Sequence, residues 1–154
     1  DILTTNALVI KNKYIQKKKF DFIFGSVKKH WGILHGYKPN KIKYSWGFYS
    51  SHSTGFFISK KAAQKVGNYN IKYKFHADYD YFYRMIVKKK LIGTSTKKNE
   101  VTGIFRRGGY SSTIPYTKLF FEEIKIRYDN GQNILLLMII ILYKFIKNYK
   151  KFLR

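Results

Sequence analysis

Two aspartates in the segment KFHADYDYFYRM, residues 74 to 85, are the residues of this chain best suited to chemistry. They are Asp78 and Asp80, in a chain that has eight acidic residues against 31 lysines and arginines. A carboxylate held on a rigid element within reach of a substrate hydroxyl can act as a general base. On that interpretation Asp78 is the base, and Asp80 and Arg84 fix the helix end. A structural alternative stays open, in which Asp78 caps a helix and Asp80 pairs with Arg84 four residues later.

A glycine pair beside two arginines is a second candidate site. Arg106 and Arg107 precede Gly108 and Gly109, so that guanidinium and backbone N–H groups could hold a diphosphate. An ordinary basic turn would have the same composition. The histidines have no convincing metal-ligand spacing, so zinc is not expected.

Hydrophobic spacing predicts the elements that must position these residues, in an α/β order. The predicted helices cover residues 4–19, 60–66, 78–90, 116–129 and 133–154, and the predicted strands cover residues 20–27, 55–59, 91–96 and 101–105. Thr4 or Thr5 would cap the first helix, whereas Ser59 would cap the second and Gly67 would end it. Residues 30–53 are expected to form a substrate-facing loop or a short hairpin.

The composition is that of a globular protein with a polyanionic neighbour. The length of 154 residues suits about one domain, and aromatic residues make up 19% of the chain. The formal charge of +23 predicts a nucleic acid, an anionic lipid or a phosphate-bearing substrate as partner. Because the chain has no cysteine, disulfides, thiolate metal sites and cysteine nucleophiles are excluded. The first residues do not resemble a signal peptide.

The C-terminal helix is apolar from Ile134 to Tyr143 and lysine-rich thereafter. Its apolar run is shorter than the ~20 residues that span a bilayer. Two interpretations remain open: a helix packed on the core, or a basic amphipathic helix lying on an anionic membrane surface.

The order of several segments resembles family 2 glycosyltransferases of the GT-A fold, over roughly residues 1 to 115. The corresponding residues are His52, the GFFIS strand, Gly67-Asn68-Tyr69-Asn70, Asp78-Tyr79-Asp80, Arg84, and Phe105, Gly108, Gly109, Tyr110 and Ser111 in GIFRRGGYSS. The strand FDFIFGSV is similar to the one that follows the donor site, although Gly25-Ser26 stands where many members have Gly-Asp. The processive enzymes' Gln-x-x-Arg-Trp pattern is absent.

This resemblance implies an inverting, non-processive, hexosyltransferase-like enzyme. Asp78 would deprotonate the acceptor hydroxyl, while His52, Asp80, Arg84, Arg106, Arg107, Gly108 and Gly109 would bind substrate. The family also uses a divalent metal, Mn²⁺ or Mg²⁺, and Asp1 stands where the last acid of its metal-binding element would be. The nucleotide-binding half has no counterpart, so we expect residues 1–115 to be the C-terminal part of a GT-A-like catalytic domain within a longer enzyme.

The sequence therefore predicts a GT-A-like mixed sheet flanked by helices, followed by a helical extension at residues 116–154. The expected donor is a nucleoside-diphosphate sugar, and the expected acceptor is a glycan or lipid-linked glycan in polysaccharide biosynthesis. The expected location is cytoplasmic, peripheral on the inner face of a membrane. The alternative function is a basic nucleic-acid-binding module, favoured by lysines interleaved with aromatic residues but disfavoured by the Asp-x-Asp pair. On balance no nucleic-acid partner is expected.

Overall fold

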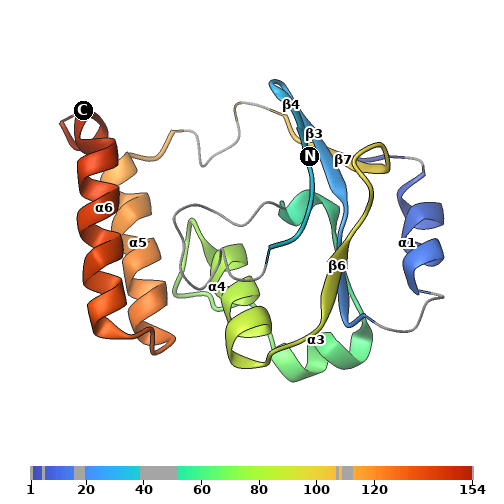
Figure 1. Ribbon diagram of the computed structural model, residues 1–154, viewed down its shortest axis with the longest axis horizontal. Helices are drawn as coiled ribbons and strands as arrows, with labels where there is room; N and C mark the ends of the chain where they lie inside the picture. Colours follow the sequence, from blue (N-terminus) through green and yellow to red (C-terminus); the bar gives the residue numbers. More distant parts are fainter. Residues whose placement is uncertain are drawn as a thin grey trace.

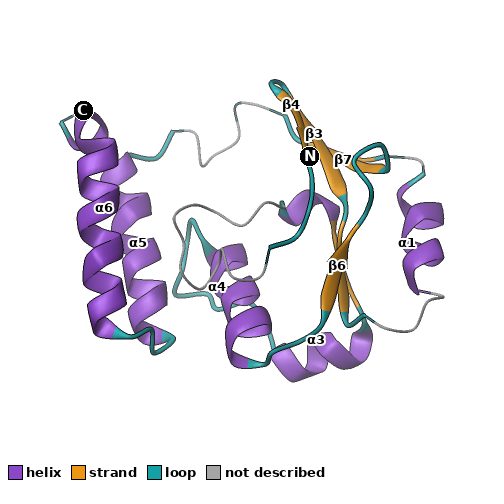
Figure 2. Ribbon diagram, viewed as in Figure 1, coloured by secondary structure: helices purple, strands orange, loops and turns teal. Residues whose placement is uncertain are grey.

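The protein is a mixed α/β structure with two small mixed sheets flanked by helices (Figures 1 and 2). The computed structural model describes residues 2–4, 6–15, 20–38, 52–106, 108 and 113–153. Its strands are β1 (Ile2–Leu3), β2 (Phe22–Phe24), β3 (Ser26–Lys29), β4 (Gly32–Leu34), β5 (Phe56–Ile58), β6 (Gly93–Ser95) and β7 (Val101–Ile104). Its α-helices are α1 (Ala7–Ile15), α3 (Lys60–Val66), α4 (Ala77–Tyr83), α5 (Tyr116–Asp129) and α6 (Ile134–Phe152).

One extended segment, β2 followed by β3, joins the two sheets. The sheet orders are β1-β7-β3-β4 and β5-β2-β6, and β2 pairs with β6 and β3 with β7 in parallel. Gly25 separates β2 from β3, and its N–H donates to the Gly55 carbonyl oxygen at 2.8 Å. A Cβ at Gly25 would lie 1.9 Å from Oγ1 of Thr102, so the glycine lets β7 approach this junction closely. The predicted strand at residues 20–27 is thus confirmed, with its break at Gly25.

The core lies between the smaller sheet and α4. Phe22 and Phe24 are 1% exposed and Phe82 on α4 is fully buried. The rings of Phe24 and Phe82 meet edge to face, with centroids 5.0 Å apart. This arrangement suits the aromatic quadrupole and adds to the burial of apolar area. The aromatic content of the chain therefore serves to fix α4 against the sheet.

Local signals set the limits of α3 and α4. The Ser59 hydroxyl accepts a hydrogen bond from the Ala62 N–H at 3.2 Å, and Gly67 ends α3 with φ +81°, as predicted. Helix α4 begins at Ala77 and continues into a π-helical turn from Arg84 to Lys88. Its predicted apolar stripe is buried at Tyr79, Phe82, Tyr83 and Ile86.

Helices α5 and α6 form an antiparallel hairpin whose α5 packs on α4 (Figure 1). The helix predicted at residues 116–129 is confirmed with the same limits. Arg127 is completely buried, and it donates to Glu123 and Gln132 while its guanidinium lies 5.2 Å from the Tyr79 ring centroid. Lys144 of α6 also donates to Glu123. Charged groups therefore hold α4, α5 and α6 together.

The N-terminal segment differs from its prediction. The helix begins at Ala7 rather than residue 4, and Leu3 belongs to β1. Thr4 does not cap the helix with its side chain: its hydroxyl donates to the Val101 carbonyl oxygen at 2.8 Å. The Thr4 hydroxyl is thus used to bind β7 instead of capping the helix. Thr5, the other predicted cap, lies outside the described residues. In the segment predicted as loop or hairpin, β4 pairs with β3 as a short hairpin, and residues 39–51 are outside the described part.

Candidate functional site

Asp78 lies in the first turn of α4 and is half-buried. Because the helix begins at Ala77, its N-cap is His76, which makes no side-chain capping bond. The Asp78 carboxylate instead accepts a hydrogen bond from the adjacent Tyr79 N–H at 2.8 Å. The prediction that Asp78 is the N-cap is therefore wrong. An acid in the first turn still benefits from the positive end of the helix dipole.

Among the acidic residues that the structure describes, Asp78 is the one whose carboxylate has no hydrogen-bond or ion-pair partner outside its own helix. Six others bond to a basic side chain or to a segment distant in sequence: Asp21 to Ile92, Asp80 to Arg84 and Asn130, Glu100 to Lys13 and Tyr14, Glu122 to residues 74–76, Glu123 to Arg127 and Lys144, and Asp129 to Tyr73. Those carboxylates hold the fold together. Within the described residues, the Asp78 carboxylate is the one without such a bond.

His52 is an electrostatic neighbour of Asp78 that is neutral at pH 7. Burial, with repulsion from Lys29, lowers the His52 pKa to about 4, although the Asp78 carboxylate acts to raise it. Nδ1 of His52 accepts from the Thr54 N–H at 3.2 Å and lies 2.8 Å from Oγ1 of Thr54. This pattern assigns the imidazole proton to Nε2, which is left as a donor. A substrate contact by His52 is consistent with this geometry and stays a prediction.

An aromatic pocket is lined by Tyr69, another electrostatic neighbour of Asp78. The rings of Tyr69 and Tyr81 are stacked, with centroids 4.5 Å apart and planes 17° apart, and Tyr81 follows Asp78 by one helical turn. They border a surface pocket of about 500 Å³, together with Gln64 and Asn68. Burial, Tyr81 and Asp78 all raise the Tyr69 pKa, so Tyr69 and Asp78 are also electrostatic neighbours. No sequence pattern predicted this pocket, because Tyr69 was singled out only within the motif Gly67-Asn68-Tyr69-Asn70.

Asp80 and Arg84 form the predicted ion pair, and this pair orders three elements. Asp80 is 1% exposed; it accepts from Nε of Arg84 and from Nδ2 of Asn130, each at 2.8 Å. Arg84 also donates to the carbonyl oxygens of Val66, at the end of α3, and Asn68. These contacts position α4. Both residues border a polar surface pocket of about 420 Å³, and substrate binding by them stays a prediction.

Arg106 is exposed and lies in a basic pocket of about 400 Å³, beside Lys28, Lys29 and Phe105. The Phe105 ring lies 4.5 Å from the His52 ring, and Nζ of Lys29 lies 4.6 Å from its centroid. The basic pocket thus adjoins His52. Gly108 is exposed with φ +87°, a backbone conformation that favours glycine. Of the other predicted site residues, Arg107, Gly109 and Asp1 lie outside the described residues.

Two further properties concern metals and membranes. In the described ranges, no group of three or more His, Asp or Glu side chains is arranged to hold a metal ion. The predicted metal residue Asp1 falls outside those ranges. Among the helices described, none is both long and apolar enough to cross a bilayer.

The fold and the site define a mixed α/β protein with a half-buried carboxylate that is an electrostatic neighbour of a neutral histidine and of a tyrosine lining an aromatic pocket. Comparison with protein families, with curated proteins and with solved structures found no match for this chain.

Proposed function

We propose that this chain carries the acceptor side of an inverting glycosyltransferase, with Asp78 as the general base. The observation that carries the proposal is the state of Asp78. It is half-buried on a helix fixed by other carboxylates, and its own carboxylate has no side-chain partner among the described residues. A general base needs such a rigid mount and a free oxygen.

The surroundings of Asp78 suit a sugar acceptor and a phosphate-bearing donor. The stacked tyrosines offer an aromatic face to the apolar side of a sugar ring, and Gln64 and Asn68 supply amide groups for its hydroxyls. On the His52 side, Lys28, Lys29 and Arg106 supply positive charge for a diphosphate. An acceptor hydroxyl at Asp78 would therefore have as electrostatic neighbours Tyr69, which lines the sugar-binding surface, and His52, which adjoins the phosphate-binding one.

The reaction balances with these groups. The Asp78 carboxylate takes the proton of the acceptor hydroxyl as that oxygen forms a bond to the anomeric carbon of the donor sugar. The bond from the anomeric carbon to the diphosphate oxygen breaks on the opposite side, so that configuration inverts and a nucleoside diphosphate leaves. The Nε2–H of neutral His52 is a suitable donor to a hydroxyl or phosphate oxygen in this site. A divalent metal would offset charge on the leaving group; the prediction of such a metal rests on Asp1 and not on the described residues.

The test is release of nucleoside diphosphate by the full-length protein from a panel of nucleotide sugars, with glycan and lipid-linked glycan acceptors, and with Mn²⁺ or Mg²⁺ against chelator. Asp78→Asn should lower kcat by about 10²–10⁴-fold, the usual contribution of a general base, with little change in KM. Asp21→Asn is the matched control, because Asp21 contacts the Ile92 N–H instead of the site, and it should keep near wild-type turnover.

Two results would refute the proposal. Near wild-type turnover in Asp78→Asn would remove the base assignment while leaving the enzyme class intact. No release from any donor, with every acceptor and with the protein shown to be folded, would remove the enzyme class itself. In that case polyanion binding, measured as a steep salt dependence on arbitrary DNA, becomes the next hypothesis.

A further inference from the structure

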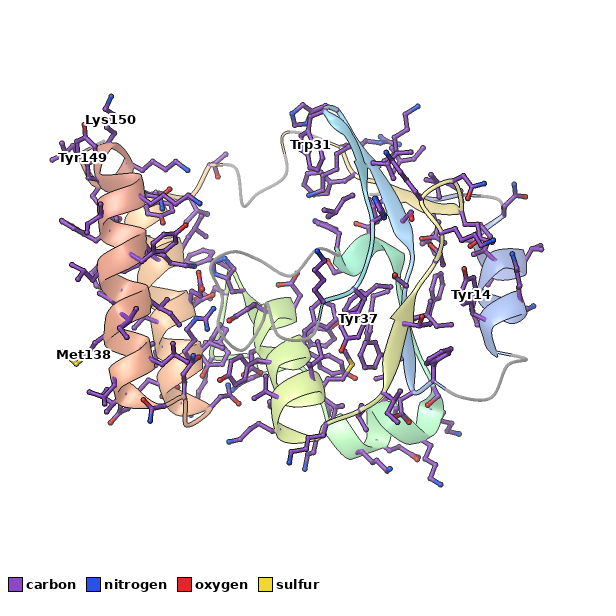
Figure 3. All side chains as sticks on the ribbon, viewed as in Figure 1. Tyr14, Trp31, Tyr37, Met138, Tyr149 and Lys150 are labelled. Carbon is purple, nitrogen blue, oxygen red and sulfur yellow. The ribbon has the colours of Figure 1, made fainter. Side chains whose placement is uncertain are left out.

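Helix α6 presents an apolar stripe to solvent. The stripe consists of Leu135, Met138, Ile139, Leu142, Ile146 and Tyr149, and each of these side chains is more than half exposed. From Leu135 to Ile146, separations of one, three and four residues place these side chains on one face of the helix. Tyr149 follows Asn148, where the backbone of α6 is not helical (φ −118°, ψ 19°). Met138 and Tyr149 point away from α5 and the rest of the molecule (Figure 3). We call this face the outer stripe.

The outer stripe is not the face by which α6 folds onto the protein. Leu137 and Ile140, which are buried, lie on the opposite face together with Lys144. Lys144 is a charged residue that points inward, where it pairs with Glu123 of α5 and its side chain is 13% exposed. Burial lowers the Lys144 pKa despite that pairing. The helix therefore buries a charged residue beside Leu137 and Ile140, while it leaves the apolar residues of the outer stripe exposed, which is unusual for a surface helix.

The charges beside the outer stripe select its partner. No acidic residue occurs between Ile134 and Leu153, whereas Lys147 and Lys150 are exposed next to the stripe. Nζ of Lys147 lies 5.4 Å from the Tyr143 ring centroid, and Nζ of Lys150 lies 5.9 Å from that of Tyr149. Lys150 and Tyr149 both project from the C-terminal end of α6, away from the rest of the molecule (Figure 3). An apolar stripe bordered by lysines and tyrosine fits the boundary between lipid headgroups and acyl chains.

Other occupants fit this surface less well. A second copy would bring two lysine-bordered stripes together on chains of formal charge +23, so that like charges would face each other. A nucleic acid would be served by the lysines but would leave the aliphatic side chains without a partner. An anionic lipid surface satisfies both features, with acyl chains for the stripe and phosphates for the lysines.

We propose that α6 is an amphipathic helix that docks the protein on an anionic membrane surface, parallel to its plane. The outer stripe enters the headgroup region, Lys147 and Lys150 bind lipid phosphates, and α5 separates the membrane from α4. This inference is independent of the chemistry assigned to Asp78, because no residue of the outer stripe borders that site.

The test is flotation of the full chain with vesicles of phosphatidylcholine alone or with about 30 mol% phosphatidylglycerol, the anionic component. The wild type should float with the anionic vesicles, with a partition coefficient that falls as salt is raised. The double variant Leu142→Gln/Ile146→Gln should lower that coefficient at least about tenfold, because it removes apolar area from the stripe. Lys147→Gln/Lys150→Gln should weaken binding and flatten its salt dependence.

The matched control is Leu8→Gln/Val9→Gln. These residues are also exposed, at 61% and 71%, but lie on α1 at the far end of the molecule (Figure 1). The control should bind as the wild type does. Because the chain has no cysteine, Met138→Cys and Leu8→Cys can each carry a single polarity-sensitive dye. The label at residue 138 should shift to shorter wavelength on anionic vesicles, while the label at residue 8 should not.

Three results would overturn the proposal. Equal flotation of the stripe variant and the wild type would show that the stripe does not enter the membrane. Equal flotation with neutral and anionic vesicles would remove the role of the lysines. A monomer–dimer equilibrium, measured by light scattering and abolished by Leu142→Gln/Ile146→Gln, would identify a second copy as the occupant.

Discussion

Glu122 supports the segment that leads into α4, and two substitutions of this residue should lower the free energy of unfolding by different amounts. Its carboxylate accepts three backbone hydrogen bonds, from Lys74 at 3.0 Å and from Phe75 and His76 at 2.7 Å each. The bond from Lys74 is exposed, and water can replace it. The other two are partly buried and involve a charged acceptor. At about 1 kcal/mol each in this half-buried setting, their loss in Glu122→Ala should destabilise the protein by about 2 kcal/mol.

Glu122→Gln separates charge from geometry. The bonds from Phe75 and His76 share one oxygen, Oε1, which a glutamine carbonyl can replace. The amide nitrogen would then face Lys74, and neutral bonds are about half as strong as charge-assisted ones. We therefore expect about 1 kcal/mol of destabilisation from Glu122→Gln. Lys125→Ala is the control, because Lys125 is exposed on the same helix, and its expected change is below about 0.5 kcal/mol.

Urea unfolding measured by circular dichroism, with amide exchange of Phe75 and His76, tests this reasoning. The Ala variant should lower the urea midpoint by about 1 M, given the usual slope for a protein of this size. Its two amides should exchange faster, while the Gln variant should keep most of their protection. If Glu122→Ala unfolds within about 0.5 kcal/mol of the wild type with unchanged exchange, these bonds do not support the segment.

Two further predictions concern the site and the sheet junction. Burial lowers the His52 pKa to about 4, from about 6.5 in the unfolded chain. Between these two pH values the unfolded state binds more protons than the folded state. Folding stability should therefore fall as the pH drops from about 6.5 toward 4. An NMR titration should show the low midpoint, raised by Lys29→Gln and lowered by Asp78→Asn; a wild-type midpoint near 6.5 would contradict it. Gly25→Ala should destabilise the protein by at least about 1–3 kcal/mol, because its Cβ would meet the side chain of Thr102. Thr102→Ser should not relieve this clash, because Oγ remains. In a Thr102→Gly background, which is itself less stable because it loses a buried side chain, adding Gly25→Ala should cost much less. Thermal unfolding of these variants checks this, and a stable Gly25→Ala single variant would exclude the close approach.

The elements that the sequence predicts correctly are those set by neighbouring residues. The alternation of Phe22 and Phe24 indicates β2, and Ser59 and Gly67 mark the ends of α3, because both signals act within a few residues. The Asp80–Arg84 pair is predictable for the same reason. Contacts between distant segments are not. Glu122 bonds to a backbone segment 46 to 48 residues earlier, and no local rule connects them.

The same distinction explains what was missed at the candidate site. The hypothesis that Asp78 has a catalytic role rests in the sequence on a scarce acidic residue in an aromatic segment and stays a prediction, whereas its lack of a side-chain partner among the described residues depends on where the other acids bond. Asn130 binds Asp80 from 50 residues away, and the Tyr69–Tyr81 stack depends on the loop between α3 and α4. The N-cap prediction is wrong because α4 begins at Ala77, one residue before Asp78, so Asp78 lies inside the first turn. The residues just before the helix are held instead by Glu122, from a segment distant in sequence.

Helix α5 connects the segment before α4, the helix that carries Asp78, with the membrane-docking helix α6 of the second proposal. On one side its Glu122 holds the segment before α4, and on the other its Glu123 binds Lys144 of α6. Burial alone would raise the Glu123 pKa, but Lys144 and Arg127 beside it hold that pKa below its ordinary value, so the carboxylate stays charged and the pairing persists at neutral pH. Two adjacent acids thus attach α6 and the segment that leads into α4 to the same helix. On the two proposals together, a membrane bound by the outer stripe would hold Asp78 at a set height and orientation above the lipid, an arrangement that would suit a lipid-linked acceptor.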